Sequence, residues 1–177
     1  GQMQALFGDE ENGGFYFYGH DGEELISRPK EIYDGALPSG NSVAAREIMR
    51  LARLTGDPEQ QAVAEGILNA FAGEVKRYPA GHGFLLQALL LAIVPGKEVV
   101  VVGDLQHPET RQLLNTVQRS FLPEVSLLAA AEPNDFGKAA PFAAAINSSS
   151  DTRVYLCQNY ACGLPETDIA KVLTQLL

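Results

Sequence analysis

Apolar residues between positions 41 and 94 recur every three or four residues, the spacing that places them along one face of an α-helix. The pattern predicts three helices, over 41–55, 57–78 and 83–94. The first is expected to begin with Asn41 or Ser42 as its N-cap, and Asp57 followed by Pro58 marks the start of the second. The third is apolar on nearly every side, so we expect it to be the most deeply buried of the three.

After Pro95 the pattern changes to continuous apolar runs of strand length. We expect strands over 98–103, 125–129 and 153–157, and helices over 108–121 and 167–177. The first strand, helix and second strand follow one another closely, which predicts a right-handed βαβ unit. The chain is therefore expected to have a mixed α and β fold, with a helical domain over 1–95 and a small three-stranded α/β module over 96–177.

The first forty residues are rich in turn-forming residues. Four consecutive aromatic residues, Phe15–Tyr18, have high β-propensity, and a returning strand over 23–27 would complete a β-hairpin. The stretch 28–41 reads as a long ordered loop, and loops of that length inside compact domains are usually functional or linkers.

The composition, 46% apolar and 20% charged over 177 residues, is that of a globular chain. The formal net charge is −9, and no cluster of Lys and Arg supplies the counter-charge that a nucleic acid or an anionic membrane requires. The longest apolar run, Phe84 to Val94, is too short to cross a bilayer, and no signal peptide is recognisable, so we expect a cytoplasmic protein. Because the chain opens with Gly1 and not with an initiator Met, we expect a fragment of a longer protein.

Two motifs that often carry chemistry are weak in this chain. Gly103 follows a strand, but the loop after it lacks the G-x-G-x-x-G pattern of a dinucleotide site, so no cofactor is expected. Cys157 and Cys162 are consistent with structural thiols, with a disulfide, or with a metal or catalytic site, in falling order of expectation. We expect both thiols to be free of metal and, in a reducing cytoplasm, to be reduced.

The loop ahead of the first helix gathers the candidate binding residues. Polar groups there would meet the free N–H donors and the positive end of a helix dipole, which suits a hydroxyl-rich ligand. The candidates are Arg28, Glu31, Tyr33, Asp34, Ser39, Asn41 and Ser42. The alternative is a rigid capping loop, in which the serines and the asparagine satisfy the start of the helix. His82, between two glycines at the start of the third helix, is a second candidate, either as an acid or base or as a structural cap.

Three separated motifs give the chain a family resemblance. They are Asp9-Glu-Glu-Asn-Gly-Gly-Phe-Tyr-Phe17, the run from Arg28 to Ala45, and Cys157-Gln-Asn-Tyr-Ala-Cys-Gly-Leu-Pro165. Together, and in this order, they resemble the spermatogenesis-associated protein 20 family, which includes the bacterial YyaL proteins. The resemblance implies a C-terminal part of a longer protein that carries a thioredoxin-like domain and an α/α toroid like that of N-acylglucosamine 2-epimerases. The C-x-x-C-type motif of the thioredoxin-like domain has no counterpart here.

The toroid implied by this resemblance predicts a site. Inner helices of such a six-hairpin toroid present their N-termini at one end of a central funnel, so Asp34, Ser39, Asn41 and His82 would converge there. The first hypothesis is a sugar-type ligand site with His82 and Asp34 as catalytic residues and Tyr33 as a stacking face. The second is a non-enzymatic structural or partner-binding module of a thioredoxin-domain protein. Neither hypothesis requires a metal or a cofactor.

The same resemblance predicts association. A toroid helix is buried against both neighbouring hairpins, and only about three helices of such a ring are present here. We therefore expect an uncovered apolar stripe that includes Ile48 and Leu51. Its partner would be the remaining N-terminal part of the protein, or a second copy in a two-fold dimer.

Overall fold

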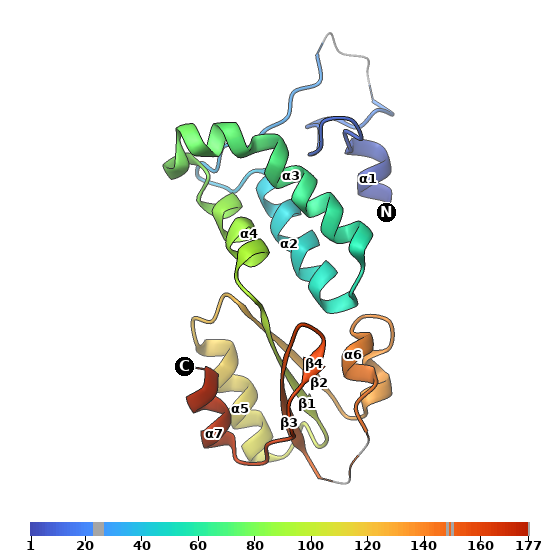
Figure 1. The fold of residues 1–177 in the computed structure, drawn as a ribbon, viewed down its shortest axis with the longest axis vertical. Helices are drawn as coiled ribbons and strands as arrows, with labels where there is room; N and C mark the ends of the chain where they lie inside the picture. The colour runs from blue at the N-terminus through green and yellow to red at the C-terminus, as the bar shows by residue number, and fades with distance from the viewer. Residues whose placement is uncertain (23–26, 148, 150, 177) are drawn as a thin grey trace. The chain divides into compact units, whose positions relative to one another are not determined.

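The computed structural model describes residues 1–22, 27–147, 149 and 151–176. Contacts divide the chain into two compact units (Figure 1). The first contains Gly1–Arg53 and Asp57–Ile93, and the second contains Leu54–Gly56 and Val94–Leu177. The fold is mixed α and β, as predicted, and each unit is described by itself. Among the described residues, no helix is both long and apolar enough to span a membrane.

Helices dominate the first unit. They are α1 (Gln2–Phe7), α2 (Gly40–Thr55), α3 (Pro58–Arg77), the short 3₁₀ helix η1 (Pro79–Gly81) and α4 (Gly83–Ile93). The three predicted helices are confirmed as α2, α3 and α4, and α1 was not predicted. They enclose one apolar core, which includes Phe15, Ile32, Ala45, Ile48, Met49, Ile67, Phe71, Leu85 and Leu91.

Helices α2 and α3 each begin directly after a residue whose side chain caps the first turn. At α3 the Asp57 carboxylate accepts the N–H groups of Glu59 and Gln60, as the sequence predicted. At α2 the prediction of Asn41 or Ser42 as N-cap is wrong. The Ser39 hydroxyl accepts the Ser42 N–H at 3.1 Å, and the helix begins at Gly40.

Burial in the helices differs from the sequence prediction in two ways. Helix α4 is not deeply buried, because Leu85 is inside while Leu90 and Ile93 are 45% and 69% exposed. The expected uncovered apolar stripe on α2 is wrong for Ile48 and confirmed for Leu51. Ile48 is 6% exposed and belongs to the core, whereas Leu51 is 53% exposed.

The predicted aromatic strand is also wrong. Only Phe15 makes a bridge, with Gly8, and the residues up to Tyr18 are not a strand. The cause lies in Gly13 and Gly14, whose φ angles of 73° and 78° turn the chain back against α3. Most of the expected returning strand, residues 23–26, lies outside the described residues.

The second unit is built on a sheet with strand order β2-β1-β3-β4. Its elements are β1 (Lys97–Val102), α5 (Pro108–Arg119), β2 (Val125–Ala130), η2 (Pro133–Phe136), α6 (Pro141–Ala144), β3 (Arg153–Gln158), β4 (Ala161–Cys162) and α7 (Ile169–Leu176). Strand β1 is parallel to β2 and antiparallel to β3. The three predicted strands are confirmed, but the short strand β4 makes the sheet four-stranded rather than three-stranded.

The sheet is covered on both faces, as its continuous apolar first strand predicts (Figure 1). Val99 and Val101 of β1 pack with α5 and α7 on one face, and Val100 and Val102 pack with η2 and α6 on the other. All four valines are almost completely buried.

The expectation of reduced cysteines is wrong. Cys157 and Cys162 are directly opposite each other in the β3–β4 pair and form a disulfide. Asn159 and Tyr160 adopt positive φ angles of 51° and 64° in the turn between the strands, as a tight type I′ hairpin turn requires. The tight turn brings the two thiols face to face, which their spacing of five residues alone did not reveal.

Candidate functional site

Asp34 connects the long loop to the starts of two helices. Its carboxylate accepts the N–H of Ser39 at 2.9 Å, and on its other oxygen the N–H groups of Phe84 and Leu85 at 2.7 and 3.1 Å. Its own N–H donates to the carbonyl of Gly81 at 2.8 Å. Asp34 therefore caps α4 from a position 50 residues earlier in the chain.

The charge on this carboxylate is stabilised by its donors. Desolvation raises the pKa of Asp34, but hydrogen bonds from the Ser39 backbone, the Ser42 side chain and the backbones of Leu85 and Phe84 outweigh it and hold the pKa below its ordinary value. The carboxylate is thus ionised at neutral pH, and both of its oxygens already accept hydrogen bonds.

His82 lies directly before α4 and is 5% exposed. Its Nδ1 lies 3.0 Å from the carbonyl oxygen of Ile32. A carbonyl only accepts, so this contact assigns the proton to Nδ1. The imidazole is therefore fixed to the same loop that carries Asp34.

Asn41 joins a third segment to the cluster. Its Oδ1 accepts the N–H of Phe15 at 2.7 Å, and its Nδ2 donates to the carbonyls of Phe15 and Glu31 at 2.8 and 2.9 Å. Beside it, the Ser39 hydroxyl donates to the Ser42 hydroxyl at 2.9 Å. These five side chains are all hydrogen-bonded to the same loop or within it. We call them the loop cluster: Asp34, Ser39, Asn41, Ser42 and His82.

The other predicted site residues lie outside these hydrogen bonds. Glu31 contributes its backbone carbonyl, while its side chain is exposed. The Tyr33 ring is 56% exposed and packs on Gly81, where a Cβ would lie only 3.0 Å from it and 2.6 Å from the Tyr78 ring. The Arg28 guanidinium stacks on the Tyr16 ring at 4.1 Å and donates to the backbone carbonyl of Tyr18. Arg28 therefore belongs to a second cluster.

That second cluster centres on Asp9, which the sequence placed in a family motif but not among the candidate site residues. The Asp9 carboxylate pairs with Lys30 at 2.6 Å and accepts the Tyr16 hydroxyl at 2.8 Å. The Lys30 hydrogen bond is the largest of the causes that hold the pKa of Asp9 well below its ordinary range, and the Asp9 bond raises the pKa of Tyr16. The local sequence indicates only that Asp9 begins a turn that ends at two glycines, where its carboxylate accepts backbone N–H groups. It does not indicate the ion pair, because Lys30 is 21 residues further along the chain.

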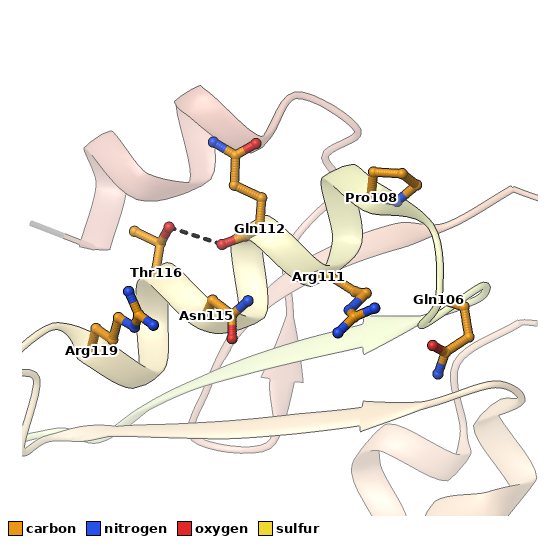
Figure 2. A pocket seen from close by; sticks show the side chains of 7 residues that line it. All are labelled: Gln106, Pro108, Arg111, Gln112, Asn115, Thr116 and Arg119. Atoms are coloured by element: carbon orange, nitrogen blue, oxygen red, sulfur yellow. Dashed lines mark hydrogen bonds between the residues drawn. The ribbon is translucent and has the colours of Figure 1, made fainter.

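Two pockets lie elsewhere. One of about 560 Å³ is formed by α1, the loop from Gly8 to Phe15, and four residues of α3: Ala62, Val63, Gly66 and Ile67. Another of about 530 Å³ lies along α5 in the second unit (Figure 2). None of the loop-cluster residues lines either pocket.

The chain is similar to known proteins over most of its length, although no protein-family model matches it. Over 170 residues, or 94% of the chain, it is 34% identical to spermatogenesis-associated protein 20 of Rattus norvegicus and 32% identical to that of Homo sapiens. Over that length the chain is similar to one part of spermatogenesis-associated protein 20. The resemblance drawn from the three motifs is confirmed.

Two further facts define the relation to spermatogenesis-associated protein 20. The chain spans about a fifth of the length of these relatives, 22% of the rat and human proteins. An uncharacterised protein of Caenorhabditis elegans is 26% identical over 87% of the chain.

Proposed function

We propose that the first unit is a non-enzymatic partner-binding module, in which the loop cluster is structural and the apolar face of α4 binds another helix. The observation that carries the proposal is the surface of α4, which contains no charged residue. Leu89, Leu90 and Ile93 are 38%, 45% and 69% exposed on it. Exposed apolar faces of this kind are typical of protein interfaces.

The hydrogen bonding of the loop cluster supports a structural role over a catalytic one. A general base must direct a free lone pair at the proton it removes. Both oxygens of Asp34 instead accept backbone N–H groups. The Nδ1–H of His82 donates to a backbone carbonyl, and because the residue is only 5% exposed, its ring is largely closed off from any ligand. These contacts anchor the loop and start α4 at Gly83.

For the partner we propose a helix from another part of a longer protein. The relatives are between four and five times as long as the matched segment, so they contain further chain that can supply this helix. In this proposal α2, α3 and α4 are three helices of an α/α toroid, and the next helical hairpin of the toroid covers Leu90 and Ile93.

A pair of measurements tests this function. Leu90→Asp is introduced into the 177-residue chain and into the full-length protein. Because Leu90 is 45% exposed, the short chain should lose only about 1 kcal/mol of unfolding free energy, from the buried half of the side chain. The full-length protein should lose more than about 2 kcal/mol, since the charge would be buried in the helix contact. Leu37→Asp, at a site 80% exposed in the loop, is the matched control. Equal small losses in both proteins would reject the proposal.

A second candidate, a sugar-type ligand, is favoured by the two tyrosine rings that pack on Gly81. Tyr33 and Tyr78 are each more than half exposed and offer aromatic faces next to the loop cluster. Titration with an N-acetylhexosamine should then shift the NMR signals of both rings in a saturable way, and Tyr33→Ala should abolish the effect. Tyr18→Ala, at another half-exposed ring, is the control. No shift at millimolar sugar would exclude this ligand.

A further inference from the structure

The second unit leaves one edge of its sheet open. Strand β2 is outermost in the sheet, and no strand among the described residues pairs with its outer side. The Gly103 N–H donates to the Ala130 carbonyl at 3.1 Å, and hydrogen bonding along a parallel pair alternates from residue to residue. Ala130 therefore faces β1, while Leu127 and Ala129 direct their N–H and carbonyl groups to the open side.

This edge lacks the usual protection against pairing. Natural edge strands are often guarded by charged residues or prolines, because an open edge is a template for another strand. The β2 sequence, Val-Ser-Leu-Leu-Ala-Ala, contains neither. Ala129 is exposed and residues 125–128 are only partly buried, whereas Ala130 is buried in the core. A strand could add here without displacing any side chain of β2.

Helix α5 borders the same edge and carries positive charge. On one face of the sheet α5 contacts β2 and α7 lies on β3, so α5 is the helix of that face nearest to the open side. On the other face η2 contacts β2. The pocket of about 530 Å³ along α5 is lined by Pro108 and six polar side chains, which include two arginines and no carboxylate. Figure 2 shows Arg111, Asn115 and Arg119 on one side of the helix and Gln112 on the other. Neither arginine takes part in an ion pair with any of the residues that the structure describes.

The spacing of the two arginines matches an extended chain. Arg111 and Arg119 are eight helical residues apart, about 12 Å along the axis. Residues four apart in a strand are about 13 Å apart and lie on the same face. A strand added to β2 would therefore present side chains i and i+4 at about the same interval as the two arginine positions along the helix axis.

We propose that the outer edge of β2 and the arginine row of α5 form a docking site for an extended acidic peptide. The peptide adds to β2 as a fifth strand through main-chain hydrogen bonds to Leu127 and Ala129. Two carboxylates four residues apart pair with Arg111 and Arg119, which charge-assisted hydrogen bonds favour. The site lies in the second unit and is independent of the function proposed for the first.

The test is a titration of the ¹⁵N-labelled 177-residue chain with a synthetic nonapeptide. The peptide alternates Thr and Val, with Glu at its third and seventh positions. The amide signals of Leu127 and Ala129 should shift in a saturable way, and the affinity should fall as salt is added. The Arg111→Glu and Arg119→Glu double variant should bind at least tenfold more weakly. Lys138→Glu, which changes an exposed lysine outside this surface, should alter the affinity less than twofold.

A second variant separates strand addition from simple charge attraction. Ala129→Pro removes an outward N–H and leaves both arginines in place, so it should also weaken binding, with a circular dichroism spectrum like that of the parent. Shifts confined to the arginine side chains would overturn strand addition. Equal binding of a peptide with Lys in place of Glu, or no shift at millimolar peptide, would overturn the site as a whole.

Discussion

Replacement of Asp34 by alanine is the sharpest test of the structural role of the loop cluster. The substitution removes an acceptor of three backbone N–H groups, those of Ser39, Phe84 and Leu85. Loss of a helix cap costs about 1 kcal/mol and up to about 2. Loss of the hydrogen bond from the Ser39 N–H in the loop adds about 1 kcal/mol to this cost. We expect Asp34→Ala to lower the unfolding free energy of the first unit by about 2–3 kcal/mol.

The effect should depend on pH with a definite sign. The pKa of Asp34 is below its ordinary value in the folded chain, so its ionised form stabilises the fold. That stabilisation is complete above the unfolded pKa, about 3.9, and is lost as the pH falls through the lower folded value. The difference between the parent and Asp34→Ala should therefore be largest near pH 7 and shrink at pH 3.

Urea denaturation, followed by the NMR signals of α4, measures this difference. A loss of about 2–3 kcal/mol moves the urea midpoint by roughly 1–2 M at ordinary denaturant slopes. Glu31→Ala is the matched control, because Glu31 lies in the same loop and its contact with Asn41 uses only its backbone carbonyl. A midpoint for Asp34→Ala equal to that of Glu31→Ala would refute the capping role.

Three further outcomes follow from the structure. His82→Ala should cost about 1–3 kcal/mol, measured by the same denaturation, because a buried backbone carbonyl loses its donor; no loss would contradict this role. Asp9→Asn should lower the pKa of Tyr16 toward its ordinary value in an NMR titration, and an unchanged pKa would contradict the hydrogen bond between them. Thiol titration of the unreduced chain should detect no free cysteine, since Cys157 and Cys162 are joined; reduction should cost about 2 kcal/mol.

Local patterns predicted most of the regular structure. The 3.6-residue period identified α2 and α3, and the Asp57 cap with its proline located the start of α3. The run of four valines predicted a strand covered on both faces because no polar residue interrupts it. In each case the signal is complete within the element itself.

Features that depend on distant contacts were predicted less well. The burial of α4 depends on which neighbours cover it, and its apolar sequence could not distinguish a covered side from an open one. The Asp9–Lys30 ion pair joins residues 21 positions apart, with nothing local to connect them. The loop cluster was anticipated as a set of residues, but the sequence did not reveal that backbone groups occupy the Asp34 carboxylate and His82 Nδ1.

The central claim, that the apolar face of α4 binds a helix of the longer protein, is tested most directly by hydroxyl-radical footprinting. Leu90 and Ile93 should be oxidised readily in the 177-residue chain, where they are 45% and 69% exposed. In the full-length protein their oxidation should fall several-fold, while the buried Leu85 on the same helix stays unreactive in both. Equal oxidation of Leu90 and Ile93 in the two proteins would contradict the account.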